Sequence, residues 1–87
     1  MYAIIVYDVG VKRVNKVKKL LRQYMVWIQN SVFEGELTES ELIQVKRRLK
    51  EIIDADSDAV QFYILKSEKY LKRDVLGTPK AEPENIL

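Results

Sequence analysis

The first segment of the chain limits the possible folds most strongly. Residues 2–7 read Tyr-Ala-Ile-Ile-Val-Tyr, an almost continuous run of apolar, mostly β-branched and aromatic residues. Such a run is typical of a strand that is buried on both faces. It stops at Asp8, which Val9 and Gly10 follow as a turn signal. The 87 residues suffice for one domain with a single core, so a second domain is excluded.

Two later segments have the periodicity of amphipathic helices. The first covers residues 12–25, and the second begins at a capping box formed by Thr38 and Glu41 and runs to about residue 54. Their apolar faces consist of Val14, Val17, Leu21 and Tyr24 in the first helix, and of Leu42, Val45, Leu49 and Ile52 or Ile53 in the second.

Three further segments are predicted to be strands: residues 25–29 and 32–37, which form a hairpin around Asn30 and Ser31, and residues 60–65. The order strand–helix–strand–strand–helix–strand is the plan of a ferredoxin-like α+β sandwich, with two helices on one face of a four-stranded antiparallel sheet. Apolar strand residues on the other face then need a partner. We expect an additional C-terminal strand at residues 75–78. The domain therefore covers residues 1–78, and residues 79–87 form a tail.

The composition excludes several kinds of chemistry. The chain has no cysteine and no histidine, so it offers neither disulfides, nor a thiolate zinc site, nor an imidazole base. Any metal must be a hard ion with oxygen ligands, such as Mg²⁺, Mn²⁺ or Ca²⁺. No apolar run is long enough for a membrane span and no signal peptide is visible, so we expect a cytoplasmic protein without a membrane partner.

Positive charge is concentrated in the first third of the chain. Residues 1–33 carry six Lys and Arg against Asp8 alone, a net charge of +5, and residues 34–58 carry −4. No acid in the first helix can pair with its cations at a spacing of four. Either this is an ordinary solvated face, or it binds the phosphates of a nucleic acid. The candidate nucleic-acid-binding residues are Lys12, Arg13, Lys16, Lys19 and Arg22.

Asp8 is the leading candidate for a catalytic or metal-binding residue. A carboxylate at the end of an apolar strand, next to a basic helix, can hold a hard metal ion beside a phosphate. The alternative is a simple turn or helix cap. Because one carboxylate rarely holds Mg²⁺ alone, a dimer that brings two copies together would complete the site. The acidic segment 54–58 resembles the start of a calcium loop, but Ala59 replaces its essential glycine, so it is interpreted as a polar turn.

These residues together resemble a known family. The strand that ends in Tyr-Asp, the basic helix and above all residues 27–35 (Trp-Ile-Gln-Asn-Ser-Val-Phe-Glu-Gly) are similar to the CRISPR-associated protein family Cas2. The segment that contains Asp56, Asp58, Val60 and Tyr63 fits as well. The likeness covers about residues 1–78, and the combination is specific although each motif alone is weak.

The resemblance implies a homodimer in which the strand near residues 75–78 pairs with the partner's sheet. It also implies CRISPR spacer acquisition together with the integrase Cas1, with duplex DNA lying across the dimer. Metal-dependent endonuclease activity on RNA or double-stranded DNA is implied too. Asp8 would be the catalytic and metal-binding residue, paired with the partner's Asp8 on Mg²⁺ or Mn²⁺, and Tyr7, Ser31 and Phe33 would line the site. Many family members have arginines after the first strand, where this chain has Lys12, Arg13 and Lys16. Lysine lacks the bidentate phosphate geometry of arginine.

Two other functions remain open from the sequence. The protein could be a non-catalytic adaptor that spaces integrase dimers and binds DNA through its basic helices. From another class, it could be a ferredoxin-like regulatory domain that binds a small ligand at a dimer interface, although the family motif argues against this.

Overall fold

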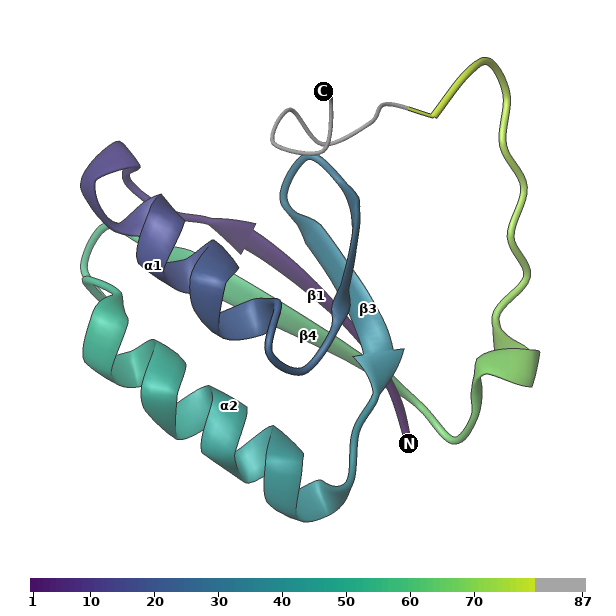
Figure 1. The fold of residues 1–87 in the computed structure, drawn as a ribbon, viewed down its shortest axis with the longest axis horizontal. Helices are drawn as coiled ribbons and strands as arrows, with labels where there is room; N and C mark the ends of the chain where they lie inside the picture. The colour runs from purple at the N-terminus through teal and green to yellow at the C-terminus, as the bar shows by residue number, and fades with distance from the viewer. Residues whose placement is uncertain (80–87) are drawn as a thin grey trace.

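A computed structural model describes residues 1–79 of the chain (Figure 1). Its elements are, in chain order, β1 (Tyr2–Asp8), α1 (Val11–Leu21), β2 (Val26–Gln29), β3 (Val32–Glu36), α2 (Glu39–Ile52), β4 (Ala59–Leu65) and a 3-10 helix, η1 (Glu68–Tyr70). This order confirms the arrangement of strands and helices predicted from the sequence. Residues 80–87, which make up most of the predicted tail, lie outside the described residues.

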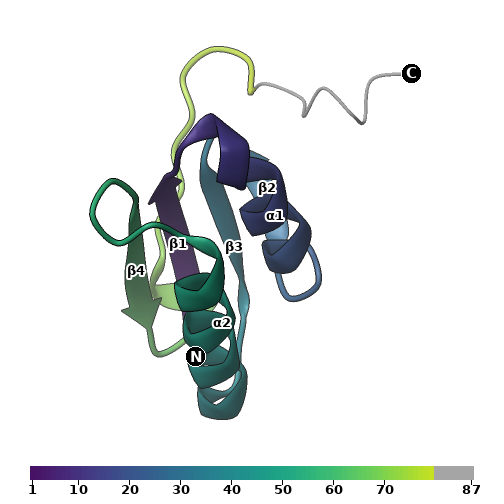
Figure 2. The same ribbon diagram turned by 90° about the vertical axis from the view of Figure 1, so that its left-hand side faces the viewer.

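The four strands form one antiparallel sheet in the order β2-β3-β1-β4, so that β1 is a central strand. β3 pairs with β1 as far as Val6, which lies opposite Val32, whereas β4 pairs with β1 as far as Asp8, which lies opposite Ala59. Both helices lie on the same side of the sheet (Figure 2). The predicted ferredoxin-like α+β sandwich is therefore confirmed.

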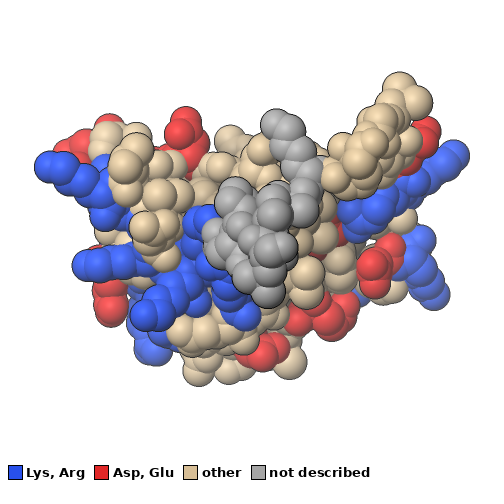
Figure 3. Space-filling model, turned by 45° about the horizontal axis from the view of Figure 1, so that its top comes forward, with Lys and Arg blue, Asp and Glu red and all other residues tan. Residues whose placement is uncertain are grey.

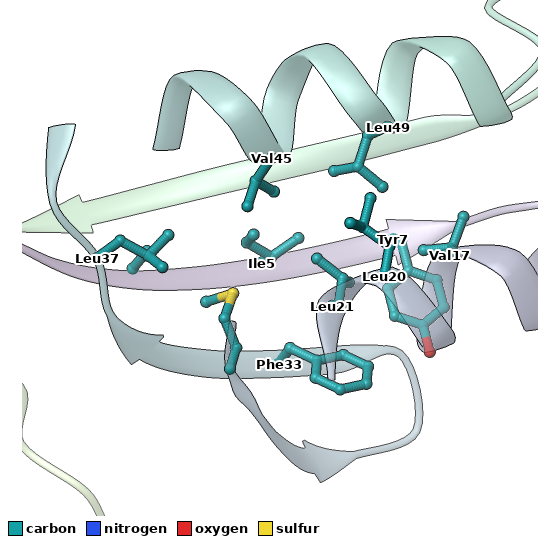
Figure 4. Close-up of a cluster of buried hydrophobic side chains, with 11 residues drawn as sticks. Ile5, Tyr7, Val17, Leu20, Leu21, Phe33, Leu37, Val45 and Leu49 are labelled. Carbon is teal, nitrogen blue, oxygen red and sulfur yellow. The ribbon is translucent and has the colours of Figure 1, made fainter. Parts of the chain in front are cut away.

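The core lies between the helices and one face of the sheet. Ala3, Ile5 and Tyr7 of β1 point toward the helices and are at most 4% exposed. Figure 4 shows how side chains from both helices and from β3 surround this row. The residues that complete the core are Val17, Leu20, Leu21, Met25, Phe33, Leu37, Val45 and Leu49.

The helix starts and ends differ in how well the sequence predicted them. At the start of α2, Thr38 Oγ1 accepts a bond from the Glu41 amide at 3.0 Å, and the Glu41 carboxylate accepts one from the Thr38 amide at 2.9 Å, which confirms the capping box. α1, in contrast, ends at Leu21, four residues before its predicted end. The helix stops early because Met25, 6% exposed, enters the core and the chain then turns into β2.

Neither α1 nor α2 covers the other face of the sheet. Ile4 and Val6 of β1 are half-buried on this face, and Tyr63, which lies opposite Ile4 on β4, is 52% exposed. Apolar side chains that share one face of a small sheet favour contact with another molecule. The homodimer, expected from this face, from the single Asp8 carboxylate and from the family resemblance, stays a prediction.

Residues 71–79, which follow η1, are extended. Residues 71–79 form no strand within the described single chain, whereas the sequence predicted a short strand at 75–78. That strand was expected to pair with the sheet of a second protomer, so the pairing also stays a prediction. None of the helices formed by residues 1–79 is long and apolar enough to cross a membrane.

Candidate functional site

Asp8 is the last residue of β1 and lies on the uncovered face of the sheet. Its side chain is exposed, and the residue borders a shallow hollow of about 190 Å³ together with Val6, Ala59 and Gln61. Within residues 1–79 its carboxylate takes part in no hydrogen bond or ion pair. The carboxylate is therefore available to a metal ion or to another molecule that covers this face.

The turn of the β2–β3 hairpin lies beside the end of β1. The Tyr7 amide donates a hydrogen bond of 3.0 Å to the carbonyl oxygen of Ser31. Asn30 has a φ of 37°, in the left-handed region that asparagine tolerates better than most residues. Trp27 Nε1 donates to the Asn30 carbonyl at 3.0 Å and so fixes the turn. The structure therefore brings Ser31 next to the residue that precedes Asp8.

Tyr7 and Phe33 lie on the other face of the sheet from Asp8. Their rings are 6.1 Å apart between centroids, and Phe33 is fully buried. Burial raises the pKa of the Tyr7 hydroxyl, and the nearby positive charge of Arg22 partly opposes this rise. Both side chains pack in the core behind Asp8, although Tyr7 also borders the hollow beside Asp8. The site-lining role implied for them stays a prediction.

Asp58 was interpreted only as part of a polar turn, but it is a buried ion-pair partner. Its side chain is 1% exposed and accepts bonds from Arg13 Nε at 2.6 Å and Arg13 Nη2 at 2.9 Å. These bonds, and one from the Asp54 amide, hold the pKa of Asp58 well below its usual range. An acid from a distant turn thus pairs with a cation of α1. The spacing of charges within the helix gave no sign of this partner.

The remaining candidate nucleic-acid-binding residues lie along α1 and at its C-terminal end. Lys12, Lys16, Lys19 and Arg22 are all exposed. Lys16 and Lys19 border a groove of about 190 Å³ between α1 and α2, to which α2 contributes Arg48. Figure 3 shows Lys and Arg side chains gathered on the side of the molecule where α1 and the end of α2 lie. Positive charge of this kind attracts phosphates. Arg13 differs, because Asp58 occupies one edge of its guanidinium group.

The chemistry of Asp8 fits a hard metal ion, since Mg²⁺ and Mn²⁺ prefer carboxylate oxygens. One chain, however, supplies only part of a ligand set. In the part of the chain that the structure describes, no three Asp, Glu, His or Cys side chains form a group that could hold a metal. A metal at Asp8 therefore requires further ligands from a second copy, from water or from a substrate.

A second buried carboxylate, Glu34, lies on the sheet face opposite the helices, where Arg73 contacts it. Its burial was not predicted from the sequence. Glu34 of β3 is 5% exposed and accepts bonds from the Tyr2 hydroxyl at 2.9 Å and from two nitrogens of Arg73 at 2.5 and 3.1 Å. Burial, together with the bond to Glu34, raises the pKa of Tyr2 to about 12. The bonds from Arg73 outweigh burial and lower the pKa of Glu34. This cluster fixes the C-terminal segment to the sheet at Arg73.

This cluster predicts a pH dependence of stability. Because the pKa of Glu34 is lower in the folded chain than its ordinary 4.5, ionised Glu34 stabilises the fold above that pH, and the stabilisation is lost as the pH falls through the folded pKa. We expect the free energy of unfolding of Glu34→Gln to depend less on pH below 4.5 than that of the unmodified chain. Urea unfolding at several pH values measures this, and parallel curves would contradict it. Glu51→Gln, at an exposed position of α2, is the control.

Fold and site together define a class of protein. This is a small ferredoxin-like protein with an exposed carboxylate at the end of a central strand and a basic helix directly after it. The family model described as CRISPR associated protein Cas2 matches residues 1–73. The chain therefore belongs to the Cas2 family, which confirms the resemblance found in the sequence.

Individual relatives agree with this assignment. The chain is 59% identical to a Methanosarcina acetivorans protein and 53% identical to a Pyrococcus furiosus protein, each over the full length of both chains, and both relatives are named CRISPR-associated endoribonuclease Cas2. A solved structure described as "Crystal structure of cas2" has a TM-score of 0.85 at 47% identity and covers 100% of this chain and 98% of its own. Cas2 of Streptococcus pyogenes, at 37% identity and TM-score 0.78, covers 88% of this chain and 100% of its own.

Proposed function

We propose that the protein acts in CRISPR spacer acquisition as a homodimeric, metal-dependent endonuclease that cuts RNA or duplex DNA. The observation that carries this proposal is the placement of Asp8, an exposed carboxylate at the end of an uncovered, partly apolar sheet face. A second copy packed on that face would bring two Asp8 residues to one interface. The names of the relatives, all CRISPR-associated endoribonucleases, support the same reaction class.

The two Asp8 carboxylates of such a dimer would hold Mg²⁺ or Mn²⁺. When bound, the ion supplies Lewis-acid activation of water and neutralises charge on the phosphodiester. The chain's own residues would exclude water and attract the nucleic acid. The half-buried Ile4 and Val6 exclude water from the interface, and the side chains at the start of α1 attract the nucleic-acid backbone. The chain has no histidine, so cleavage through an imidazole acid and base is excluded.

Cleavage assays test this proposal directly. The purified protein is incubated with single-stranded RNA and with duplex DNA, in Mg²⁺, in Mn²⁺ and in EDTA, while light scattering measures its mass in solution. We expect a dimer that cuts at least one substrate only when a divalent metal is present. A stable monomer, or a dimer that cuts neither substrate with either metal, would contradict the proposal.

A second function is favoured by one specific observation. The basic side chains belong to α1, whose helix packs on the opposite face of the sheet from Asp8 (Figure 2). A nucleic acid bound along α1 would therefore lie on the opposite side of the sheet from the Asp8 carboxylate. This separation supports a scaffold role, in which the dimer binds duplex DNA and the integrase Cas1 in the cytoplasm without cutting. Retention of Cas1 and DNA by a cleavage-deficient variant would support the scaffold role, and loss of both would oppose it.

The basic helix gives a prediction for binding under either function. Reversing two charges, as in Lys16→Glu with Lys19→Glu, should weaken duplex DNA binding by at least about tenfold at low salt, because phosphate contacts release counterions and each contributes to affinity. It should also flatten the dependence of affinity on salt concentration. Fluorescence anisotropy at several salt concentrations measures both quantities. The matched control reverses Lys66 and Lys72, two exposed cations outside both helices. Equal losses in the two variants would contradict a specific role of α1.

A further inference from the structure

One buried carboxylate joins the two turns at the end of the sheet that carries Asp8. Asp58 Oδ1 accepts bonds from the Gly10 amide and from Arg13 Nη2, each at 2.9 Å. Its Oδ2 accepts bonds from Arg13 Nε at 2.6 Å and from the Asp54 amide at 2.9 Å. Both oxygens are thus saturated by donors from the β1–α1 turn, from α1 and from the α2–β4 turn.

The absence of a side chain at Gly10 is part of this arrangement. A Cβ atom at this position would lie 2.6 Å from Arg13 Nη2 and 3.6 Å from Asp58 Oδ1. The backbone of Gly10 has φ −57° and ψ 148°, a conformation open to any residue. Glycine is therefore needed here for space, because the guanidinium group of Arg13 lies directly over the turn.

Asp8 depends on these turns because the sheet holds it on one side only. The pairing of β1 with β3 ends at Val6, while Asp8 is the last residue of β1 that pairs with β4, opposite Ala59. Asp58 is bonded to the amide two residues after Asp8 and directly precedes Ala59 in the chain. It therefore restrains the backbone on both sides of this last pair.

We propose that Asp58 is a positioning residue for Asp8: with Arg13 and Gly10 it fixes the turn that sets the direction of the Asp8 carboxylate. This inference rests on the proposed metal site at Asp8. It also assigns Arg13 a role different from phosphate binding, since Asp58 occupies Nε and Nη2, one edge of the guanidinium group that could otherwise form a bidentate contact with phosphate.

Asp58→Asn tests the proposal with a nearly isosteric change. Each oxygen of Asp58 accepts two bonds, so either orientation of the amide turns its NH₂ group toward two donors. Asp56→Asn is the matched control, because Asp56 is an exposed residue of the same turn and loses the same charge. Gly10→Ala is a second variant, because its Cβ would displace the guanidinium group of Arg13 from Asp58 while its backbone conformation suits alanine. Circular dichroism verifies that each full-length variant is folded.

The measurement uses Mn²⁺ alone, without substrate. Paramagnetic broadening of the amide signals of Asp8, Val9 and Gly10 is followed by NMR as Mn²⁺ is added. We expect broadening in the unmodified protein, binding weaker by about tenfold in Asp58→Asn, as for other groups that orient metal ligands, and a smaller loss in Gly10→Ala. Asp56→Asn should bind like the unmodified protein. If Asp58→Asn does not fold, the Gly10→Ala result decides.

Two other results would overturn the inference in distinguishable ways. Normal Mn²⁺ binding in folded Asp58→Asn and in Gly10→Ala would remove the positioning role and leave the site at Asp8 intact. No broadening near Asp8 in the unmodified protein would instead remove the metal site itself, and the positioning role with it. Amide hydrogen exchange at Gly10 adds a readout without metal, because loss of its bond to Asp58 should speed exchange.

Discussion

Asp8→Asn should reduce cleavage by about 10²–10³-fold, the loss typical when one charge-stabilising group is removed from an active site. The change removes the negative charge that a hard metal ion needs and keeps the size of the side chain. Because Asp8 is exposed and its carboxylate makes no hydrogen bond or ion pair within residues 1–79, the melting temperature should hardly change. The measurement is the initial rate of Mg²⁺-dependent cleavage, with Asp56→Asn as a control of equal charge change.

Mixed dimers make this test specific for a shared site. If unmodified and Asp8→Asn chains assemble at random in equal amounts, about a quarter of the dimers carry both carboxylates. Activity should fall to that fraction if both are required. A fall to half would indicate that each protomer cuts alone. Full cleavage by Asp8→Asn itself would exclude Asp8 from the reaction.

Phe33→Ala should lower the free energy of unfolding by about 3–5 kcal/mol, the usual cost of emptying a buried aromatic site. Phe33 is fully buried, and its ring lies next to that of Tyr7. In a domain of this size each kcal/mol corresponds to roughly 4–8 °C in melting temperature, so the effect on thermal unfolding should be large. Scanning calorimetry of the protein at fixed concentration measures it.

Phe33→Leu is the control for this prediction, since it keeps an apolar side chain and should cost much less. The pair also separates the two roles considered for Phe33. A core residue changes stability first, and cleavage measured well below the melting temperature stays nearly normal in Phe33→Leu. Loss of cleavage with an unchanged melting temperature would instead make Phe33 a residue of the site.

The features that the sequence predicted well are those encoded by neighbouring residues. The buried strand of β1 and the capping box of Thr38 and Glu41 depend on residues at most a few positions apart, so composition and spacing reveal them. The end of α1 was wrong by four residues because Met25 is drawn into a core formed by distant segments. Local periodicity contains no information about whether Met25 continues the helix or packs into the core.

The features that were missed are contacts between residues far apart in the chain. Asp58 pairs with Arg13 across 45 positions, and Glu34 pairs with Arg73 across 39. A series of acids in a turn gives no sign of which one is buried. One signal was present, since Asp58 comes directly before the residue where β4 begins. An acid at the edge of a core strand has to find a cation if it is not exposed.

The ion pair between Arg73 and Glu34 also limits how far residues 74–79 can reach. Residues 74–79, which follow this fixed point, can span about 20 Å when fully extended. If the segment leaves its own subunit to join another sheet, that sheet must lie directly against the surface that Glu34 and Tyr2 occupy. The fixed position of Arg73 thus limits the distance between two subunits that residues 74–79 could join, and it favours a tightly packed pair over a loosely tethered one.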